Sequence, residues 1–165
     1  MSTRPPLPSP LLAHSRPIQV LLVEDNSADA YLFREAVRDC PAPFQLHTAP
    51  DGVEAIAFLA RQGGYHSAPR PDLIVLDLNM PRKNGHEVLA TIKANPALRL
   101  IPVVVLTTSA SPKDIAAAYQ LQASCYLQKP TALDEYLHRV GRLMQFWLRT
   151  ATLPFSSQDA RAMHG

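Results

Sequence analysis

The chain has 165 residues, 47% of them hydrophobic, and a formal net charge of +2, which fits one folded domain with short tails. Charged residues make up only 18% and form no long run of like charge, so no nucleic-acid-binding surface is expected. No apolar stretch approaches the roughly 20 residues of a membrane span. Two cysteines are too few for a disulfide framework, and Cys40 and Cys125 are expected to be free thiols in a reducing cytoplasm.

From Ile18 onwards, strand-like apolar runs alternate with helix-like segments. The expected strands are 18–24, 44–49, 72–77, 101–106 and 125–128. The expected helices are about 27–39, 52–62, 86–95, 113–122 and 132–149. Expected helix N-caps are Asn26 or Ser27, Asp51, Ser111 followed by Pro112, and Thr131, which forms a capping box with Asp134. Gly63 and Gly64 are expected to end the second helix.

The flanking segments differ in composition from this alternating part. Residues 1–16 contain several prolines and are expected to form a flexible leader, residues 17–150 the folded domain, and residues 151–165 a C-terminal tail. Five βα units with right-handed crossovers predict an α/β fold, a doubly wound sandwich with a parallel sheet. The strand order 2-1-3-4-5 is one of the two common forms of this sandwich.

Polar side chains lie just past the ends of three of the apolar runs. Glu24 and Asp25 follow the first run, Asp77 follows the third, and Lys129 follows the fifth. Because ligands bind outside the carboxyl ends of parallel strands, these groups are expected at one edge of the sheet. Oxygen ligands of this kind select Mg²⁺ or Mn²⁺. Each residue alone has an ordinary explanation, such as a solvated loop or a helix cap, and their joint order is what indicates a phosphoryl site.

At this point four segments resemble a known family. "VLLVEDN", "LIVLDLNMPRKNG", "VVVLTTS" and "CYLQKP" occur in the order and at the spacing of the receiver domain of two-component response regulators, over roughly residues 17–150. The resemblance implies the flavodoxin-like (βα)5 form with strand order 2-1-3-4-5. It also implies Mg²⁺ coordinated directly by Asp25, Asp77 and the backbone carbonyl of Asn79, with Glu24 acting through water.

The same resemblance implies roles for the reacting groups. Asp77 is the phosphoacceptor, and Lys129 and Thr107 interact with the phosphoryl oxygens. Thr107 and Tyr126 form the switch, in which Tyr126 turns from an outward to an inward rotamer. The family pattern further predicts a cis peptide between Lys129 and Pro130. Ser109, with Asn79, is expected to line the route of an attacking water.

A narrower resemblance concerns the partner protein. The loop 61–71, "NPALRLIPVVVLTTS" and "QFWLRTATLP" are similar to response regulators that serve bacterial phytochrome-type histidine kinases. A single-domain regulator that signals through protein contacts is therefore expected, with a sensor histidine kinase as phosphodonor and an unidentified downstream protein. The other functions considered are a Mg²⁺-dependent phosphatase-like hydrolase with Asp77 as nucleophile, and a scaffold that works without phosphorylation.

The last predicted helix carries more apolar surface than docking on a sheet requires. A helical projection predicts that Leu133, Leu137, Val140, Met144 and Leu148 face the sheet. A second apolar stripe is predicted to be exposed, and its members are Tyr136, Leu143, Phe146 and Trp147. This stripe predicts a homodimer formed through the last helix and the adjoining fifth strand, unless one of the tails covers it.

Overall fold

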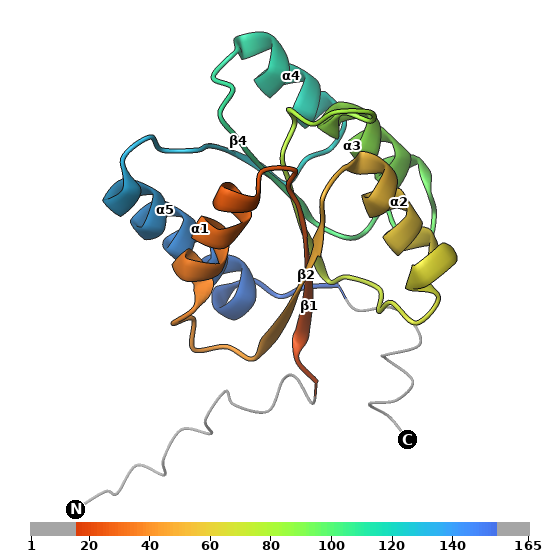
Figure 1. The fold of residues 1–165 in the computed structure, drawn as a ribbon, viewed down its shortest axis with the longest axis horizontal. Coiled ribbons are helices and arrows are strands. Elements are labelled where there is room, and N and C mark those ends of the chain that lie inside the picture. The colour runs from red at the N-terminus through yellow and green to blue at the C-terminus, as the bar shows by residue number, and fades with distance from the viewer. Residues whose placement is uncertain (1–15, 155–165) are drawn as a thin grey trace, which may run out of the picture.

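Five parallel strands form one sheet in the order β2-β1-β3-β4-β5 in a computed structural model of the chain (Figure 1), which describes residues 16–154. The strands are β1 (Ile18–Val23), β2 (Phe44–Ala49), β3 (Leu73–Leu76), β4 (Val103–Thr107) and β5 (Cys125–Gln128). The predicted fold class and strand order are confirmed. Apart from Arg16, the predicted leader lies outside the described residues, as does the tail beyond residue 154, so the predicted domain boundaries stay a prediction.

Helices cover both faces of the sheet, as Figure 1 shows. On one face, α1 (Ser27–Val37) packs beside α5 (Leu133–Gln145), which continues into a π-helical turn, η2 (Phe146–Thr150). On the other face lie α2 (Gly52–Ala60), α3 (Gly85–Ala94) and α4 (Pro112–Gln120), and a short 3-10 turn, η1 (Gly63–Tyr65), follows α2. None of the helices within residues 16–154 combines the length and the apolar character that a bilayer crossing requires.

The central strands are buried on both faces, which explains their continuous apolar sequences. Alternate residues of β1, such as Leu21 and Val23, pack into the layer under α2, α3 and α4. The intervening residues, such as Val20 and Leu22, pack into the layer under α1 and α5. Every residue of β1, β3 and β4 is buried. A continuous apolar run therefore places the polar residue that follows it at the edge of the sheet.

Three of the predicted helix caps are confirmed and two predicted helix ends are wrong. Asn26, Asp51 and Ser111 each accept a backbone N–H of the first turn of their helix. Helix α5 instead begins after Ala132, which provides no side-chain cap, and Thr131 lies one residue before this cap position and lines a cavity beside Lys129. Helix α2 ends at Arg61, which adopts the left-handed conformation (φ 55°), before the two glycines are reached.

Two predictions about the C-terminal region are also wrong. The peptide between Lys129 and Pro130 is trans, the lower-energy form for most prolines. Tyr136 is buried (3% exposed) whereas Leu133 is 54% exposed. The physical reason is that α5 packs against α1 as well as the sheet: a Cβ on Gly141 would lie 3.1 Å from the Ala36 carbonyl. This close contact turns the buried face toward Tyr136, Val140 and Met144.

Candidate phosphoacceptor site

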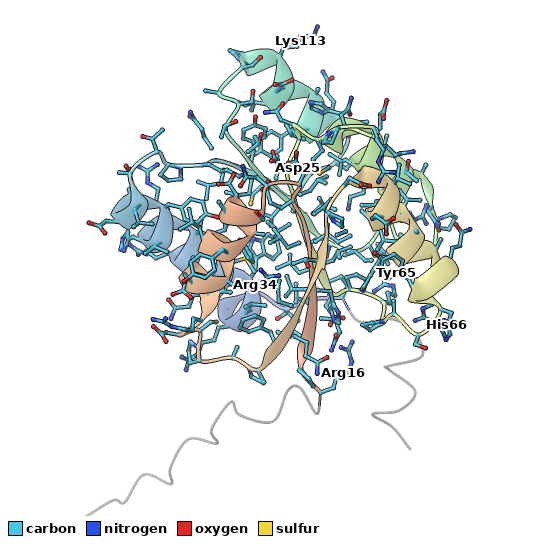
Figure 2. The ribbon with its side chains drawn as sticks, in the orientation of Figure 1. Arg16, Asp25, Arg34, Tyr65, His66 and Lys113 are labelled. Carbon is cyan, nitrogen blue, oxygen red and sulfur yellow. The ribbon has the colours of Figure 1, made fainter. Side chains whose placement is uncertain are left out.

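The site lies at the carboxyl edge of the sheet, where sheet hydrogen bonding continues past the strand ends. The backbone N–H of Glu24 donates to Ala49 (3.0 Å), and that of Asp77 donates to Val23 (3.1 Å). The N–H of Lys129 donates to the Thr107 carbonyl (2.7 Å). These bonds fix the backbone of the functional residues before any side chain is considered. Figure 2 shows Asp25 at the end of the sheet opposite to Arg16.

The ammonium of Lys129 lies among three carboxylates. It donates to Glu24 at 2.6 Å, to Asp29 at 2.9 Å and to Asp77 at 3.3 Å. Lys129 is buried, which alone would lower its pKa, but the hydrogen bonds to Glu24 and Asp29 and the charge of Asp77 raise the pKa above its ordinary value. Lys129 is therefore a fixed positive charge next to the Asp77 carboxylate.

Asp29 belongs to this site although the sequence reasoning did not identify it. It lies in the first turn of α1, where its backbone N–H donates to the capping oxygen of Asn26 (3.0 Å). The available signal was only its place in the first turn of a predicted helix, a position that acidic residues commonly occupy. Asp29 therefore supplies an additional carboxylate partner for Lys129.

Glu24 is buried, as Asp77 is, whereas Asp25 is exposed. Burial raises the pKa of the Glu24 carboxyl to about 7, although Lys129 acts in the opposite direction. Its other oxygen accepts the backbone N–H of Asn26 (3.1 Å). Glu24 is thus engaged on both oxygens by the protein, which suits a carboxylate that contacts a cation through water.

Three carboxylates of the site can converge on one cation. One oxygen each of Glu24, Asp25 and Asp77 lies within 4.8 Å of the others, and Asp25 is exposed to solvent. Two like charges about 5 Å apart repel by roughly 3 kcal/mol at an effective dielectric near 20. A divalent cation offsets this repulsion, and an oxygen-only donor set fits Mg²⁺ or Mn²⁺. The residues therefore fit the ion that the sequence predicts.

This repulsion leads to a prediction about stability. Without divalent cations, Asp25→Ala is expected to unfold at the same temperature as the wild type or higher, because the substitution removes one clustered charge from an exposed position. With saturating Mg²⁺, the wild type is expected to gain more stability, since a ligand of the folded state shifts unfolding by mass action. Thermal unfolding with and without Mg²⁺ measures both effects. If metal-free Asp25→Ala is clearly less stable than the metal-free wild type, the proposed repulsion among the carboxylates is wrong.

Polar groups surround the Thr107 hydroxyl. Thr107 is fully buried, and its hydroxyl oxygen lies 3.4 Å from the Asn79 amide nitrogen and 3.5 Å from the Ser109 backbone nitrogen. The Asn79 backbone N–H donates to Asp77 (3.2 Å). The Ser109 hydroxyl donates to Asp114 of α4 (2.6 Å). Thr107 and Asn79 are thus adjacent to Asp77, and the predicted role of Ser109 toward water stays a prediction.

Tyr126 contacts the loop between β4 and α4. Its hydroxyl donates to the Ser109 carbonyl (2.8 Å), and its backbone N–H donates to the Tyr119 hydroxyl (3.2 Å). The ring is partly buried against the core layer on the α4 side. Tyr126 is therefore connected through Ser109 to Thr107, and its rotation on phosphorylation stays a prediction.

A cavity of about 310 Å³ opens beside Lys129 between α1 and α5. Its lining residues are Asp29, Leu32, Thr108, Lys129, Pro130, Thr131, Leu133 and Tyr136. Thr108 is exposed at its edge. Thr108 therefore borders this cavity beside Lys129.

Known proteins share both the sequence and the fold. The response regulator receiver domain family matches residues 20–141. Response regulator Rcp1 of Synechocystis sp. is 49% identical over 138 residues, which cover 84% of this chain and 94% of Rcp1. The Mn²⁺-bound crystal structure of Rcp1 matches with a TM-score of 0.82. The match covers 84% of this chain and 100% of the Rcp1 chain. The crystal structure of a phosphorylated cyanobacterial phytochrome response regulator, RcpA, has the same TM-score and is 47% identical in sequence. This match covers 85% of the present chain and 100% of the RcpA chain.

The chain belongs to the response regulator receiver domain family. It is a signalling protein that accepts a phosphoryl group and is similar to phytochrome response regulators. Its acidic cluster could hold a metal ion, and the similar structure of Rcp1 contains Mn²⁺.

Proposed function

We propose that Asp77 is the phosphoacceptor and that the phosphodonor is the phosphohistidine of a sensor kinase. One oxygen of Asp77 attacks phosphorus, the bond from the donor imidazole nitrogen to phosphorus breaks, and an acyl phosphate forms on Asp77. The observation that carries this proposal is the position of Asp77, buried at the end of β3 with the Lys129 ammonium at 3.3 Å.

Asp25, Asp77 and the backbone carbonyl of Asn79 would hold Mg²⁺ directly, and Glu24 through water. When bound, the ion neutralises negative charge on the transferred phosphoryl oxygens. Lys129 adds a second positive charge beside the Asp77 carboxylate. On phosphorylation, one phosphoryl oxygen would replace a carboxylate as an acceptor of the Lys129 ammonium, which already has three anionic neighbours.

The signal would leave through the face formed by α4, β5 and α5. The Thr107 hydroxyl donates to a phosphoryl oxygen in this proposal and pulls the loop after β4 toward Asp77. Ser109 moves with Thr107, and the Tyr126 hydroxyl follows the Ser109 carbonyl that it contacts. The motion turns Tyr126 further inward and reshapes the face that a partner protein contacts.

The phosphodonor would be a phytochrome-type histidine kinase, and both proteins would act in the cytoplasm. The similarity to Rcp1 and to the phytochrome response regulator RcpA supports this proposal. Phosphotransfer from such a kinase to wild-type protein, compared with an unrelated kinase, tests it. Equal transfer rates from both kinases would contradict a phytochrome-specific partner.

A homodimer through α5 and β5 is proposed from the apolar residues at the end of α5. Phe146 is 49% exposed and packs edge-on against Trp147 with ring centroids 5.4 Å apart. Leu143 and Trp147 are partly exposed beside them. These three residues are named the α5 patch, from which the buried Tyr136 is now excluded.

The α5 patch predicts an association that sedimentation can measure. The double variant Leu143→Glu/Trp147→Glu, and the less disruptive single variant Phe146→Glu, are expected to sediment as monomers because charge replaces apolar contact area. Tyr31→Glu/Leu100→Glu, which changes exposed apolar residues outside the patch, is the control and should remain dimeric. A wild type that is monomeric with and without a phosphoryl analogue would contradict the dimer.

A further inference from the structure

The loop between β3 and α3, residues 77–84, rests on the beginning of α2. Gly52, the first residue of α2, approaches so closely that a Cβ there would overlap the Lys83 carbonyl oxygen and lie 2.8 Å from Val88 Cγ2. Gly85, which follows the loop, packs against its beginning, because a Cβ there would overlap the Asp77 carbonyl oxygen and lie 2.6 Å from Leu78 Cα. The loop that carries Asn79 is therefore packed tightly on both sides.

Arg82 lies in the middle of this loop with an unusual backbone conformation. Its φ is 64°, in the left-handed region that residues other than glycine seldom adopt. The next residue, Lys83, donates its backbone N–H to the Pro81 carbonyl (2.8 Å), which closes a tight turn around Arg82. Such a conformation persists where surrounding contacts impose it.

The contact that accompanies this turn is an ion pair with α2. The Arg82 guanidinium donates to Oδ2 of Asp51, and Oδ1 of the same carboxylate accepts the Glu54 backbone N–H (2.9 Å) as the cap of α2. Asp51 is buried, which alone would raise its pKa, yet the Glu54 N–H and Arg82 hold the pKa below its ordinary value. The carboxylate is thus fixed to α2 and available as an anchor for Arg82.

We infer that the Arg82–Asp51 ion pair positions the cation-binding loop. By tying Arg82 to α2, the pair holds the turn three residues after Asn79 and so places the Asn79 carbonyl toward the acidic cluster. Neither residue contacts the cation or the phosphoryl group, so both are positioning residues. The inference rests on the proposed function, in which this carbonyl is a ligand of the divalent cation.

The direction in which the cation affinity changes when Arg82 is replaced distinguishes a positioning role from a purely electrostatic one. Removal of a positive charge near a cation site strengthens cation binding if only charge matters. Loss of a positioning contact weakens binding, and loss of an outer partner of a metal ligand costs about 10–100-fold in affinity. Because 57% of the Arg82 side chain is exposed, the lower end of that range, about tenfold, is expected.

The test measures Mn²⁺ binding by electron paramagnetic resonance in Arg82→Ala, Arg82→Lys, Asp51→Asn and the double variant Arg82→Ala/Asp51→Asn. Asn at position 51 retains the capping oxygen and loses only the charge. Arg139→Ala is the matched control, because Arg139 forms an exposed ion pair with Glu135 elsewhere on the molecule. A second measurement is the Mg²⁺ concentration that half-saturates phosphorylation by acetyl phosphate.

Arg82→Ala and Asp51→Asn are each expected to bind Mn²⁺ about tenfold more weakly, and the double variant no more weakly than either. Arg82→Lys should recover part of the loss, and Arg139→Ala should bind like the wild type. The half-saturating Mg²⁺ concentration should rise while the phosphorylation rate at saturating Mg²⁺ stays unchanged. This pattern would support the inference, because an ion pair that only stabilised the fold would leave the affinity of folded protein unchanged.

If Arg82→Ala binds Mn²⁺ as tightly as the wild type does, or more tightly, the inference is wrong. If the wild type in that experiment still binds Mn²⁺ and is phosphorylated on Asp77, the proposed function stands without the positioning role. A wild type that neither binds Mn²⁺ nor accepts a phosphoryl group would overturn both.

Discussion

Asp77→Asn is expected to abolish phosphoryl acceptance while leaving the fold intact. The substitution preserves size and retains one oxygen that can accept from either the Asn79 N–H or Lys129, which in Asp77 contact different oxygens at 3.2 and 3.3 Å. An amide oxygen is too weak a nucleophile to form the acyl phosphate. The measurement is labelling by phosphorylated kinase or by acetyl phosphate, with circular dichroism as the check on folding.

Asp39→Asn provides the control for this variant, because Asp39 is 88% exposed at the end of α1. It should be labelled like the wild type. Undiminished labelling of Asp77→Asn would show that the phosphoryl group is accepted elsewhere, and the assignment of Asp77 would then be wrong.

The second large effect concerns the cation. Asp25→Ala is expected to weaken Mg²⁺ binding by more than about 100-fold, whereas Glu24→Ala should cost about tenfold, because the loss of an outer partner costs less than the loss of a direct ligand. Phosphotransfer at limiting Mg²⁺ should slow in the same order. The structural reason is that Asp25 is exposed, whereas both oxygens of Glu24 already accept hydrogen bonds from the protein.

A Mg²⁺ titration of both variants by calorimetry measures the difference. Equal affinities of Asp25→Ala and Glu24→Ala would contradict the distinction between a direct ligand and one that acts through water. A larger loss for Glu24→Ala would reverse the assignment of these two neighbouring carboxylates.

The sheet and the reacting groups are predictable from the sequence for a physical reason. Strands buried on both faces are continuous apolar runs, and a charged residue cannot enter such a run without a partner. The first charged residue after each run therefore marks the edge of the sheet. Glu24 and Asp77 are placed by this rule, whereas Lys129 follows the half-buried edge strand β5. The Lys129 ammonium contacts both carboxylates.

Features that depend on how helices pack against each other were predicted less well. The helical projection placed the buried face of α5 correctly at Val140 and Met144 but assigned Leu133 and Tyr136 to the wrong faces. A projection assumes that only the sheet covers the helix, and it cannot account for the contact between Gly141 and α1. Local sequence therefore shows which faces of a helix are apolar, but it does not show which neighbouring element covers each face.

Contacts between residues distant in sequence were missed for a related reason. Asp51 was identified as a helix cap, but its partner Arg82 comes from a loop 31 positions away. Asp29 was passed over because its partner Lys129 is 100 positions away. A single sequence carries no signal that joins such pairs, although each residue has a local role that can be predicted.

This chain is expected to store one phosphoryl group on Asp77 as a signal. The most direct measurement mixes the chain and Mg²⁺ with a phosphorylated phytochrome-type histidine kinase and follows the phosphate on both proteins. The kinase is expected to lose its phosphate, and the chain is expected to gain a stoichiometric, acid-stable and base-labile phosphate that Asp77→Asn lacks. Continuous turnover of small phosphate esters without a trapped phosphoprotein would instead indicate a hydrolase. A wild type that acquires no label, yet still binds its partner, would indicate a scaffold and would contradict storage of a phosphoryl signal on Asp77.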